Sequence, residues 1–260
     1  MNSDAIAGHF DLTGKVAVVT GGSRGLGLKM CQAFAQAGAD VVVASRKADA
    51  CEAAASAISE ETGQRCVGFA YHAGEWGQAD ALADFAAEQF GRVDVLVNNA
   101  GMSPLYDSLG AVTEALYDKV MQVNLQGPFR LSSIIGERMA EGEGGSIINV
   151  SSVAAVQPAP HELPYAMAKS GLNTMTRGMA HAFGPTVRVN CIMPGPFMTD
   201  ISKAWDLEAF AERARETIPL GRGGEPEEVV GAALYFASGA SSYTTGAILK
   251  IDGGSAWAAA

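Results

Sequence analysis

Cysteine and histidine are scarce in this chain, and their placement excludes several classes of protein. The 4 cysteines lie far apart and form no Cys-x-x-Cys pair, which favours buried, reduced thiols over a disulfide scaffold. The 4 histidines show no metal-ligand spacing, so we expect no metal site. The scattered cysteines therefore predict a cytoplasmic protein.

Long apolar runs and basic residues are also lacking. No stretch approaches the roughly 18 apolar residues of a membrane-spanning helix, and residues 1–10 lack the features of a signal peptide. Asp and Glu outnumber Lys and Arg by 28 to 18, giving a net charge of −10. This balance argues against nucleic acid or an anionic membrane as a partner, because both attract basic surfaces.

Short β-branched runs alternate with longer helical segments along all 260 residues. The expected strands cover residues 15–20, 41–44, 67–70, 93–97, 146–150, 187–193 and 247–251. The expected helices run from just after Gly27 to about 37, then over 48–62, 78–90, 113–139, 165–183, 206–217 and 226–238, with a bend near Gly127-Pro128. The pattern predicts an α/β fold: one domain, residues 1–260, with a doubly wound, mostly parallel seven-stranded sheet covered by helices on both faces.

A glycine-rich turn follows the first expected strand. Gly21, Gly25 and Gly27 lie between that strand and a helix, where a backbone without Cβ atoms and free helix N–H groups suit a pyrophosphate. The G-x-x-x-G-x-G spacing differs from the commoner G-x-G-x-x-G, but its position between a strand and a helix favours dinucleotide binding.

Tyr165 and Lys169 lie four residues apart in an expected helix, which places phenol and ammonium on one face. A neighbouring cation favours the phenolate, so we expect Lys169 to lower the pKa of Tyr165 and to make it a general acid–base. Ser152 follows an expected buried strand, at the sheet edge where such folds bind ligands. The alternative is a solvated lysine that packs its stem on a tyrosine ring.

Taken together and in order, these motifs resemble those of the short-chain dehydrogenase/reductase family, from about residue 12 to 254. The matching segments are Thr20–Gly27 (TGxxxGxG), Asn98–Gly101 (NNAG), Asn124, Ser152 with Tyr165 and Lys169 (YxxxK), Pro194-Gly195 and Asp252–Gly254 (DGG). The resemblance implies a Rossmann-type NAD(P)-dependent oxidoreductase, with dinucleotide binding in the N-terminal half and catalysis in the C-terminal half.

The resemblance also implies catalytic roles. Tyr165 exchanges a proton with the substrate oxygen, Ser152 hydrogen-bonds that oxygen, and Lys169 holds the nicotinamide ribose. Asn124 supports a water that links Lys169 to solvent, or alternatively only bridges backbone along its helix. Ser151 is the rival of Ser152, and the 13-residue offset to Tyr165 favours Ser152.

The expected cofactor contacts come from the ends of several strands. They are Gly21, Ser23, Arg24, Gly25, Leu26, Gly27, Ser45, Arg46, Lys47, His72, Ala73, Asn99, Ala100, Gly101, Tyr165, Lys169, Pro194, Gly195, Phe197 and Thr199. Asn98 and Asn99 have the alternative of a purely structural role. His72 replaces the family's aspartate, and it accepts a hydrogen bond from adenine, stacks on the base, or faces solvent.

The cofactor is expected to be NADP(H), with NAD(H) as the alternative. Ser45 stands where NAD-preferring members carry an acidic residue. Arg24, Arg46 and Lys47 suit a phosphate bound by fork-like hydrogen bonds, whereas solvated surface charge is the other interpretation.

The substrate segments implied by the resemblance are residues 103–106, 153–163 and 196–205, and they carry few fixed charges. We expect a neutral or apolar carbonyl or secondary alcohol, contacted by Ser152, Tyr165, Val153 and His161, and a mobile lid over about 196–217. The alternative to an enzyme is a non-catalytic nucleotide-binding protein. Enoyl reductases of the family space Tyr and Lys more widely.

The helices at 113–139 and 165–183 are apolar on more than one face. Family members pair these helices across a two-fold axis, so we expect a homotetramer, with a dimer as the next choice.

Overall fold

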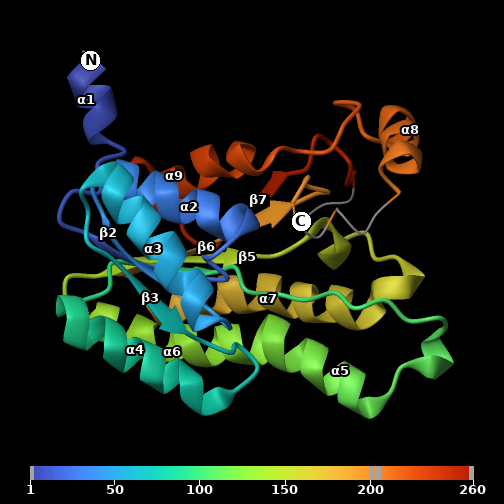
Figure 1. The fold of residues 1–260 in the computed structure, drawn as a ribbon, viewed down its shortest axis with the longest axis horizontal. Helices are drawn as coiled ribbons and strands as arrows, with labels where there is room; N and C mark the ends of the chain where they lie inside the picture. Colours follow the sequence, from blue (N-terminus) through green and yellow to red (C-terminus); the bar gives the residue numbers. More distant parts are fainter. Residues whose placement is uncertain (1–2, 200–201, 203–205, 258–260) are drawn as a thin grey trace.

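Seven parallel strands form the centre of the computed structural model, which describes residues 3–199, 202 and 206–257 (Figure 1). Their order is β3-β2-β1-β4-β5-β6-β7. The strands are β1 Val16–Thr20, β2 Asp40–Ser45, β3 Cys66–Ala70, β4 Val95–Asn98, β5 Gly145–Val150, β6 Val187–Pro194 and β7 Ile248–Ile251. The order of the strands reverses between β1 and β4, and open α/β sheets bind their ligands at the carboxyl ends of the strands at such a point.

Helices cover both faces of the sheet (Figure 1). The α-helices of the described chain are α1 Ser3–Gly8, α2 Gly25–Gln36, α3 Ala48–Thr62, α4 Trp76–Phe90, α5 Glu114–Met121, α6 Gly127–Glu141, α7 Leu163–Ala182, α8 Leu207–Thr217 and α9 Val230–Ala237, of which α1 projects away from the sheet. One core layer joins α2, α3 and α9 to the sheet, and the other joins α4, α6 and α7. Successive residues of β1 illustrate the alternation, since Ala17 and Val19 face the first layer and Val18 the second. Among the described helices, none is long and apolar enough to cross a bilayer.

The predicted seven-stranded parallel sheet is confirmed, with strand ends shifted by a residue or two. The helix expected at 113–139 is helical throughout from Glu114, but it is not one regular α-helix. The π turn η2 Gln122–Gln126 separates α5 from α6, and it lies just before the expected bend at Gly127-Pro128. Gly127 N donates to the Gln122 carbonyl across this turn, and a Cβ on Gly127 would meet the Ala73 carbonyl. The close approach of the 73 loop therefore requires glycine here.

Two further details differ from expectation. The 226–238 helix begins as the 3₁₀ turn η6 Pro226–Val229 and continues as α9. Helix α1 and the short 3₁₀ turns η1 Leu109–Ala111, η3 Val153–Ala155, η4 Pro160–Glu162 and η7 Gly239–Ser241 were not expected. Such short turns have no hydrophobic period of their own, so sequence pattern does not reveal them.

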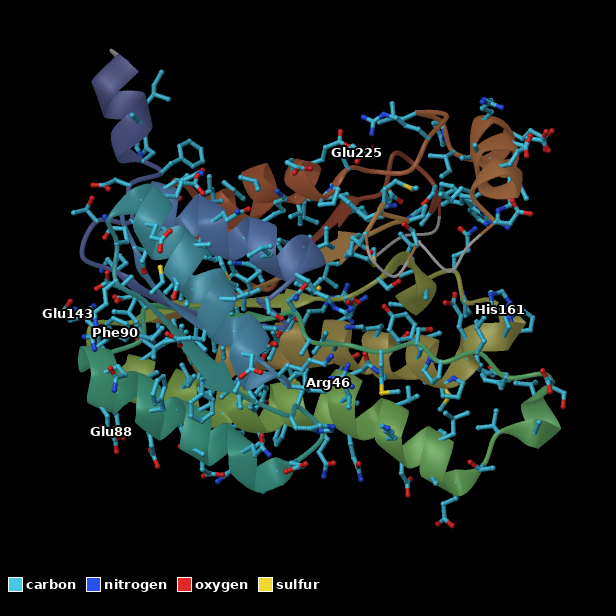
Figure 2. The ribbon with its side chains drawn as sticks, viewed as in Figure 1. Arg46, Glu88, Phe90, Glu143, His161 and Glu225 are labelled. Carbon is cyan, nitrogen blue, oxygen red and sulfur yellow. The ribbon has the colours of Figure 1, made fainter. Side chains whose placement is uncertain are left out.

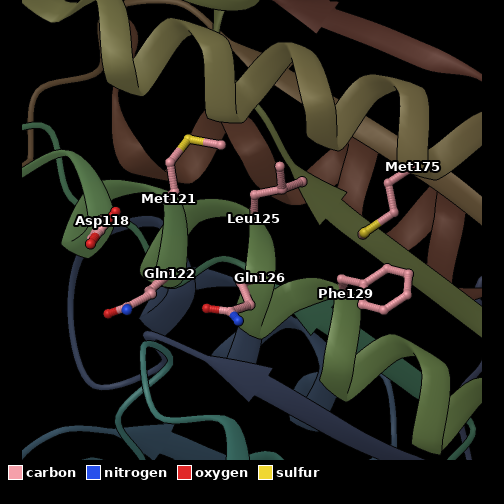
Figure 3. A pocket seen from close by; sticks show the side chains of 7 residues that line it. All are labelled: Asp118, Met121, Gln122, Leu125, Gln126, Phe129 and Met175. Atoms are coloured by element: carbon pink, nitrogen blue, oxygen red, sulfur yellow. The ribbon is translucent and has the colours of Figure 1, made fainter. Parts of the chain in front are cut away.

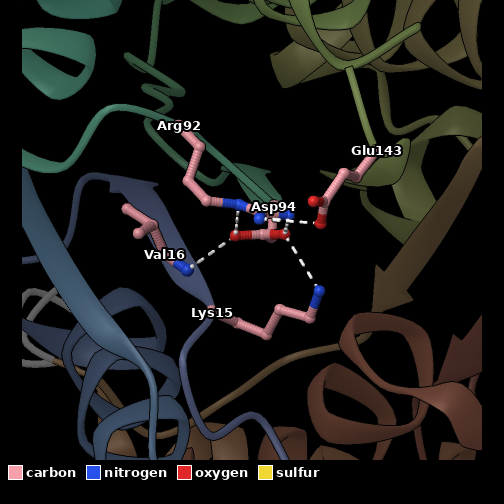
Figure 4. Close-up of polar contacts among 5 residues, drawn as sticks. All are labelled: Lys15, Val16, Arg92, Asp94 and Glu143. Carbon is pink, nitrogen blue, oxygen red and sulfur yellow. Dashed lines mark hydrogen bonds and ion pairs between the residues drawn. The ribbon is translucent and has the colours of Figure 1, made fainter.

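At the amino end of the sheet, Asp94 ties β1 to β4 (Figure 4). Its carboxylate is 5% exposed and accepts hydrogen bonds from Val16 N (3.0 Å) and Lys15 Nζ (3.2 Å). Arg92 donates to both carboxylate oxygens and also bonds Glu143. Because the carboxylate is buried and has several donors, removing its charge leaves those donors without a full partner.

Asp94→Asn should therefore lower the free energy of unfolding by about 2–3 kcal/mol, measured by chemical denaturation. Asp84→Asn is the matched control, because the Asp84–Arg138 ion pair is exposed and its loss should cost less than about 1 kcal/mol. Equal losses in the two variants would show that Asp94 does not hold the strands together.

Candidate active site

The glycine turn after β1 is held against the end of β4 by Asn99. Its Nδ2 donates to the Thr20 carbonyl (3.0 Å) and the Gly21 carbonyl (3.2 Å). Gly21 has φ of 66°, in the left-handed region that favours glycine. A Cβ on Gly27 would lie 2.5 Å from Asn99 Nδ2. The turn is thus too tight for side chains at either glycine.

Helix α2 begins at Gly25, directly after this turn. No side chain caps its N-terminus, so its first N–H groups are left for a ligand. Leu26 turns inward and packs against the core. A Cβ on Gly25 would lie 3.7 Å from Thr199, which places the segment after β6 over the turn. These residues fit the pyrophosphate of a dinucleotide, with a bare backbone cradle and uncapped amides.

The asparagines that end β4 are engaged inside the protein. Asn98 is buried, and its Nδ2 donates to Ser132 Oγ (2.8 Å) and Asn149 Oδ1 (2.9 Å). Thr20 Oγ1 accepts from the backbone N–H groups of Asn99 and Ala100. The Asn98 amide and the Asn99 Nδ2 group thus make structural hydrogen bonds within the protein. A cofactor contact of Asn99, Ala100 or Gly101 stays a prediction.

Three cations lie near the end of β2. Arg24, Arg46 and Lys47 are exposed, and none makes an ion pair with a described residue (Figure 2 labels Arg46). Beside them, the hydroxyls of Ser23 and Ser45 are hydrogen-bonded to each other at 2.8 Å. The glycine turn and the end of β2 therefore form one surface that offers hydroxyl and cationic donors.

His72 follows β3, and its ring is already used as an acceptor. The ring Nδ1 accepts from Gly74 N at 3.2 Å, while the backbone N–H of His72 donates to Gln78 Oε1. A neutral imidazole with Nδ1 as acceptor carries its proton on Nε2. The Nδ1 atom of His72 is therefore already occupied within the protein, and a hydrogen bond between the ring and adenine stays a prediction. Stacking on the base and a contact from the buried Ala73 stay predictions.

Ser152 and Tyr165 meet at the carboxyl end of β5. Ser152 is the N-cap residue of η3, and its Oγ accepts from Ala154 N at 3.2 Å. Tyr165 lies in the first turn of α7. Burial raises the pKa of Tyr165 to about 12, a hydrogen bond with Ser152 acts in the lowering direction, and the Glu162 carboxylate raises the pKa further.

Lys169, one turn further along α7, is buried. Its Nζ donates to the Val150 carbonyl at 2.7 Å and lies 5.6 Å from the centroid of the Tyr165 ring. Burial lowers the pKa of Lys169 to about 8. The expected net lowering of the Tyr165 pKa is not seen, because burial of the phenol raises it.

Asn124 lies in the π turn η2 and is fully buried. Its Nδ2 donates to the carbonyls of Val120 (2.9 Å) and Met102 (2.8 Å), and its Oδ1 accepts from Met102 N (3.1 Å). The Asn124 side chain thus links backbone groups of its own helix to those of Met102, a structural role of the kind named as the alternative. A Cβ on Gly101 would lie 2.9 Å from Asn124 Oδ1 and 3.6 Å from Lys169 Nζ, so the asparagine and the lysine approach each other at this glycine.

The remaining predicted residues lie around this centre. Pro194 ends β6, and Gly195 N donates to the Ile251 carbonyl. Phe197 is buried and forms a bridge with Gly224. Val153 starts η3, whereas His161 lies exposed in η4 (Figure 2). In the expected lid, residues 200, 201 and 203–205 lie outside the described residues.

Sequence reasoning missed two groups beside Tyr165. Tyr106 lies in the expected substrate segment 103–106, yet its hydroxyl bonds two backbone groups, the Pro160 carbonyl in η4 and the N–H of Leu163 just after it. Glu162 was not singled out, yet it lies in the recess that Tyr165 lines. Tyr106 has no motif, because it acts through contacts with a segment distant in the chain.

Comparison with known proteins agrees with this geometry. The family model described as enoyl-(acyl carrier protein) reductase matches residues 21–256. L-rhamnose 1-dehydrogenase (NAD(P)(+)) of Azotobacter vinelandii is 38% identical, covering 94% of this chain and 97% of the relative. Dehydrogenase/reductase SDR family member 4 of Homo sapiens is 34% identical, covering 98% and 92%. The crystal structure of a gluconate 5-dehydrogenase from Burkholderia cenocepacia, in complex with NADP and tartrate, has a TM-score of 0.91 at 32% identity, covering 98% and 100%.

Proposed function

The chain belongs to the short-chain dehydrogenase/reductase family, and on this basis we propose that it transfers a hydride between NADP(H) and a carbonyl or secondary alcohol. Members of the family are oxidoreductases that bind NAD(P). The observation that carries the proposal is the meeting of Ser152, Tyr165 and Lys169 beside the uncapped glycine turn. The N-terminal half would hold the dinucleotide and the C-terminal half the reacting groups.

Tyr165 is the proposed general acid–base. With a pKa near 12, its phenol keeps its proton at neutral pH and donates it to a carbonyl oxygen as that oxygen gains charge. Ser152 hydrogen-bonds the same oxygen and fixes its position. The bound dinucleotide supplies or accepts the hydride. Pro194, Gly195, Phe197 and Thr199 would line its nicotinamide end, and Val153 and His161 the substrate side.

Lys169 and Asn124 are proposed to help return a proton to Tyr165 after it has donated its own. Lys169 would also bind the ribose hydroxyls. The Asn124 side chain is committed to Met102 and Val120, so its contribution would come from its main-chain carbonyl. Pro128, four residues later, has no N–H to donate to that oxygen. The carbonyl therefore lacks its α-helical partner, which supports a role in holding water.

Tyr165→Phe should lower kcat by roughly a hundredfold to ten-thousandfold, because the proton donor is lost. The assay follows nicotinamide absorbance with a panel of ketones, aldehydes, 3-oxoacyl thioesters and sugars. Tyr235→Phe is the control, since it removes a hydroxyl that bonds Thr244 Oγ1 (2.8 Å), away from the site. Unchanged turnover in Tyr165→Phe would show that another group is the proton donor. The absence of turnover in the unaltered protein would favour a non-catalytic nucleotide-binding protein.

The preference for NADP(H) rests on charge. Arg24, Arg46 and Lys47 lack ion-pair partners among the described residues, although acidic side chains outnumber basic ones in the chain. Unpaired guanidinium groups next to a glycine turn suit a 2′-phosphate. An NAD(H)-dependent dehydrogenase is the second candidate, because the Ser23–Ser45 hydroxyl pair could also bond an unmodified ribose.

Arg46→Ser should raise KM for NADPH by about tenfold and leave KM for NADH nearly unchanged, because a charged hydrogen bond to phosphate is lost. Steady-state kinetics with both cofactors provide the measurement. Arg138→Ser, which removes a guanidinium from the exposed pair with Asp84, is the control. Higher kcat/KM with NADH than with NADPH in the unaltered protein would contradict the proposed preference.

The substrate is proposed to be neutral. Glu162 lies in the recess beside Tyr165, and its carboxylate disfavours an anion there. An enoyl thioester, the substrate type named by the matching family model, fits less well because Tyr165 and Lys169 are only four residues apart. A cytoplasmic location is also proposed, since the cysteines are free thiols, and cell fractionation tests it.

We propose that the protein is a homotetramer. A groove of about 570 Å³ runs along α5, η2, α6 and α7 (Figure 3), and its apolar lining includes Met121, Leu125, Phe129 and Met175. Phe129 is 47% exposed. A second copy that packs its helices here would cover these side chains. Light scattering of the unaltered protein should give about four times the mass of the chain. The Phe129→Glu variant should be monomeric. A monomeric unaltered protein would contradict the proposal.

A further inference from the structure

Helix α7, which carries Tyr165 and Lys169, begins without a local cap. Its N-cap residue is Glu162, whose side chain makes no capping hydrogen bond. The first N–H groups of a helix have no partner within the helix and need one from elsewhere. Because Tyr165 is the third residue of α7, a loose first turn would leave the phenol poorly positioned.

The missing cap comes from Tyr106, which lies 57 residues earlier in the chain. Its hydroxyl oxygen accepts from Leu163 N at 2.8 Å, and its O–H donates to the Pro160 carbonyl at 2.7 Å. One hydroxyl thus joins the start of α7 to the preceding turn η4. Both contacts have the short lengths of good hydrogen bonds.

The loop that carries Tyr106 is itself anchored at the active site. Met102, at the start of that loop, is bonded through both its N–H and its carbonyl to the Asn124 side chain. The π turn therefore fixes one end of the loop, and Tyr106 fixes the start of α7 to the loop. Tyr106, Glu162 and Tyr165 line the same small recess.

We propose that Tyr106 is a positioning residue, whose hydroxyl fixes the first turn of α7 and so sets the place of Tyr165 and of the Glu162 carboxylate beside it. The catalytic consequence rests on the proposed function, whereas the clamp itself does not. No motif marks Tyr106, since its two partners are backbone groups of another segment.

The charges around Tyr165 make the clamp measurable. Glu162 lies before it and Lys169 after it on α7, and Ser152 from the end of β5 and Tyr106 are the neutral hydroxyl groups nearby. Glu162 raises the pKa of Tyr165. Removing or releasing that carboxylate should lower the pKa, because the phenolate then loses a negative neighbour.

Tyr106→Phe removes both hydrogen bonds and keeps the ring. We expect amide hydrogen exchange at Leu163 to become about tenfold faster or more, measured by NMR. We also expect kcat to fall about tenfold with KM for NADPH nearly unchanged, because the dinucleotide surface is not touched. The control Tyr235→Phe loses a hydroxyl contact of the same kind and should alter neither quantity.

Glu162→Gln gives the second readout. It should shift the pKa of Tyr165 downward, in the pH dependence of kcat/KM and in tyrosinate absorbance. Adding it to Tyr106→Phe should produce a smaller shift than it does alone, because the released carboxylate is already further from the phenol. Equal shifts in both backgrounds, or unchanged exchange at Leu163 in Tyr106→Phe, would overturn the proposal.

The two proposals fail in distinguishable ways. If the unaltered protein shows no nicotinamide-dependent turnover, the proposed function fails, and exchange at Leu163 together with the Tyr165 titration still decides on the clamp. If exchange at Leu163 is faster in Tyr106→Phe while kcat and the titration equal those of the unaltered protein, Tyr106 is only structural and the inference is wrong.

Discussion

A buried ammonium is the constraint around which the active site is arranged. Taking a lysine out of water is costly unless donors and acceptors compensate, and Lys169 has the Val150 carbonyl and the face of the Tyr165 ring. Gly101 lies beside the ammonium, and a Cβ there would come within 2.9 Å of Asn124 Oδ1, which packs at the same place. The ends of β4 and β5 and the helix α7 therefore have to meet at one point for the cation to be tolerated.

The π turn is the second consequence of this meeting. An uninterrupted α-helix through residues 113–139 would give Asn124 ordinary helical surroundings. The extra residue in the turn instead accompanies a buried amide that holds both backbone groups of Met102. This contact fixes the chain after Gly101 beside Lys169, and it starts the route that ends at Tyr106 and the first turn of α7. The positions of Tyr165 and Lys169 thus depend on two contacts: the chain after Gly101 lies beside Lys169, and Tyr106 holds the first turn of α7.

Sequence reasoning succeeded where the physics is local. β-branched runs such as residues 16–20 identified strands, and the glycines at 21, 25 and 27 marked a turn whose backbone needs are visible residue by residue. It failed where an outcome depends on long-range contacts. The interruption before α6 depends on a carbonyl of the 73 loop and on Met102, and the direction of the Tyr165 pKa shift depends on burial that spacing does not reveal.

The two perturbed groups of α7 also bear on the direction of proton transfer. Burial and Glu162 keep the Tyr165 phenol protonated at neutral pH, with a pKa near 12, while burial brings the pKa of Lys169 down to about 8. Below pH 8 the lysine is charged and the phenol is neutral, so the pair can deliver a proton. Accepting one requires the phenolate, which burial disfavours more than the Ser152 hydrogen bond favours it. Within the proposed chemistry, the arrangement therefore favours donation to a carbonyl at neutral pH, and oxidation of an alcohol gains as the pH rises.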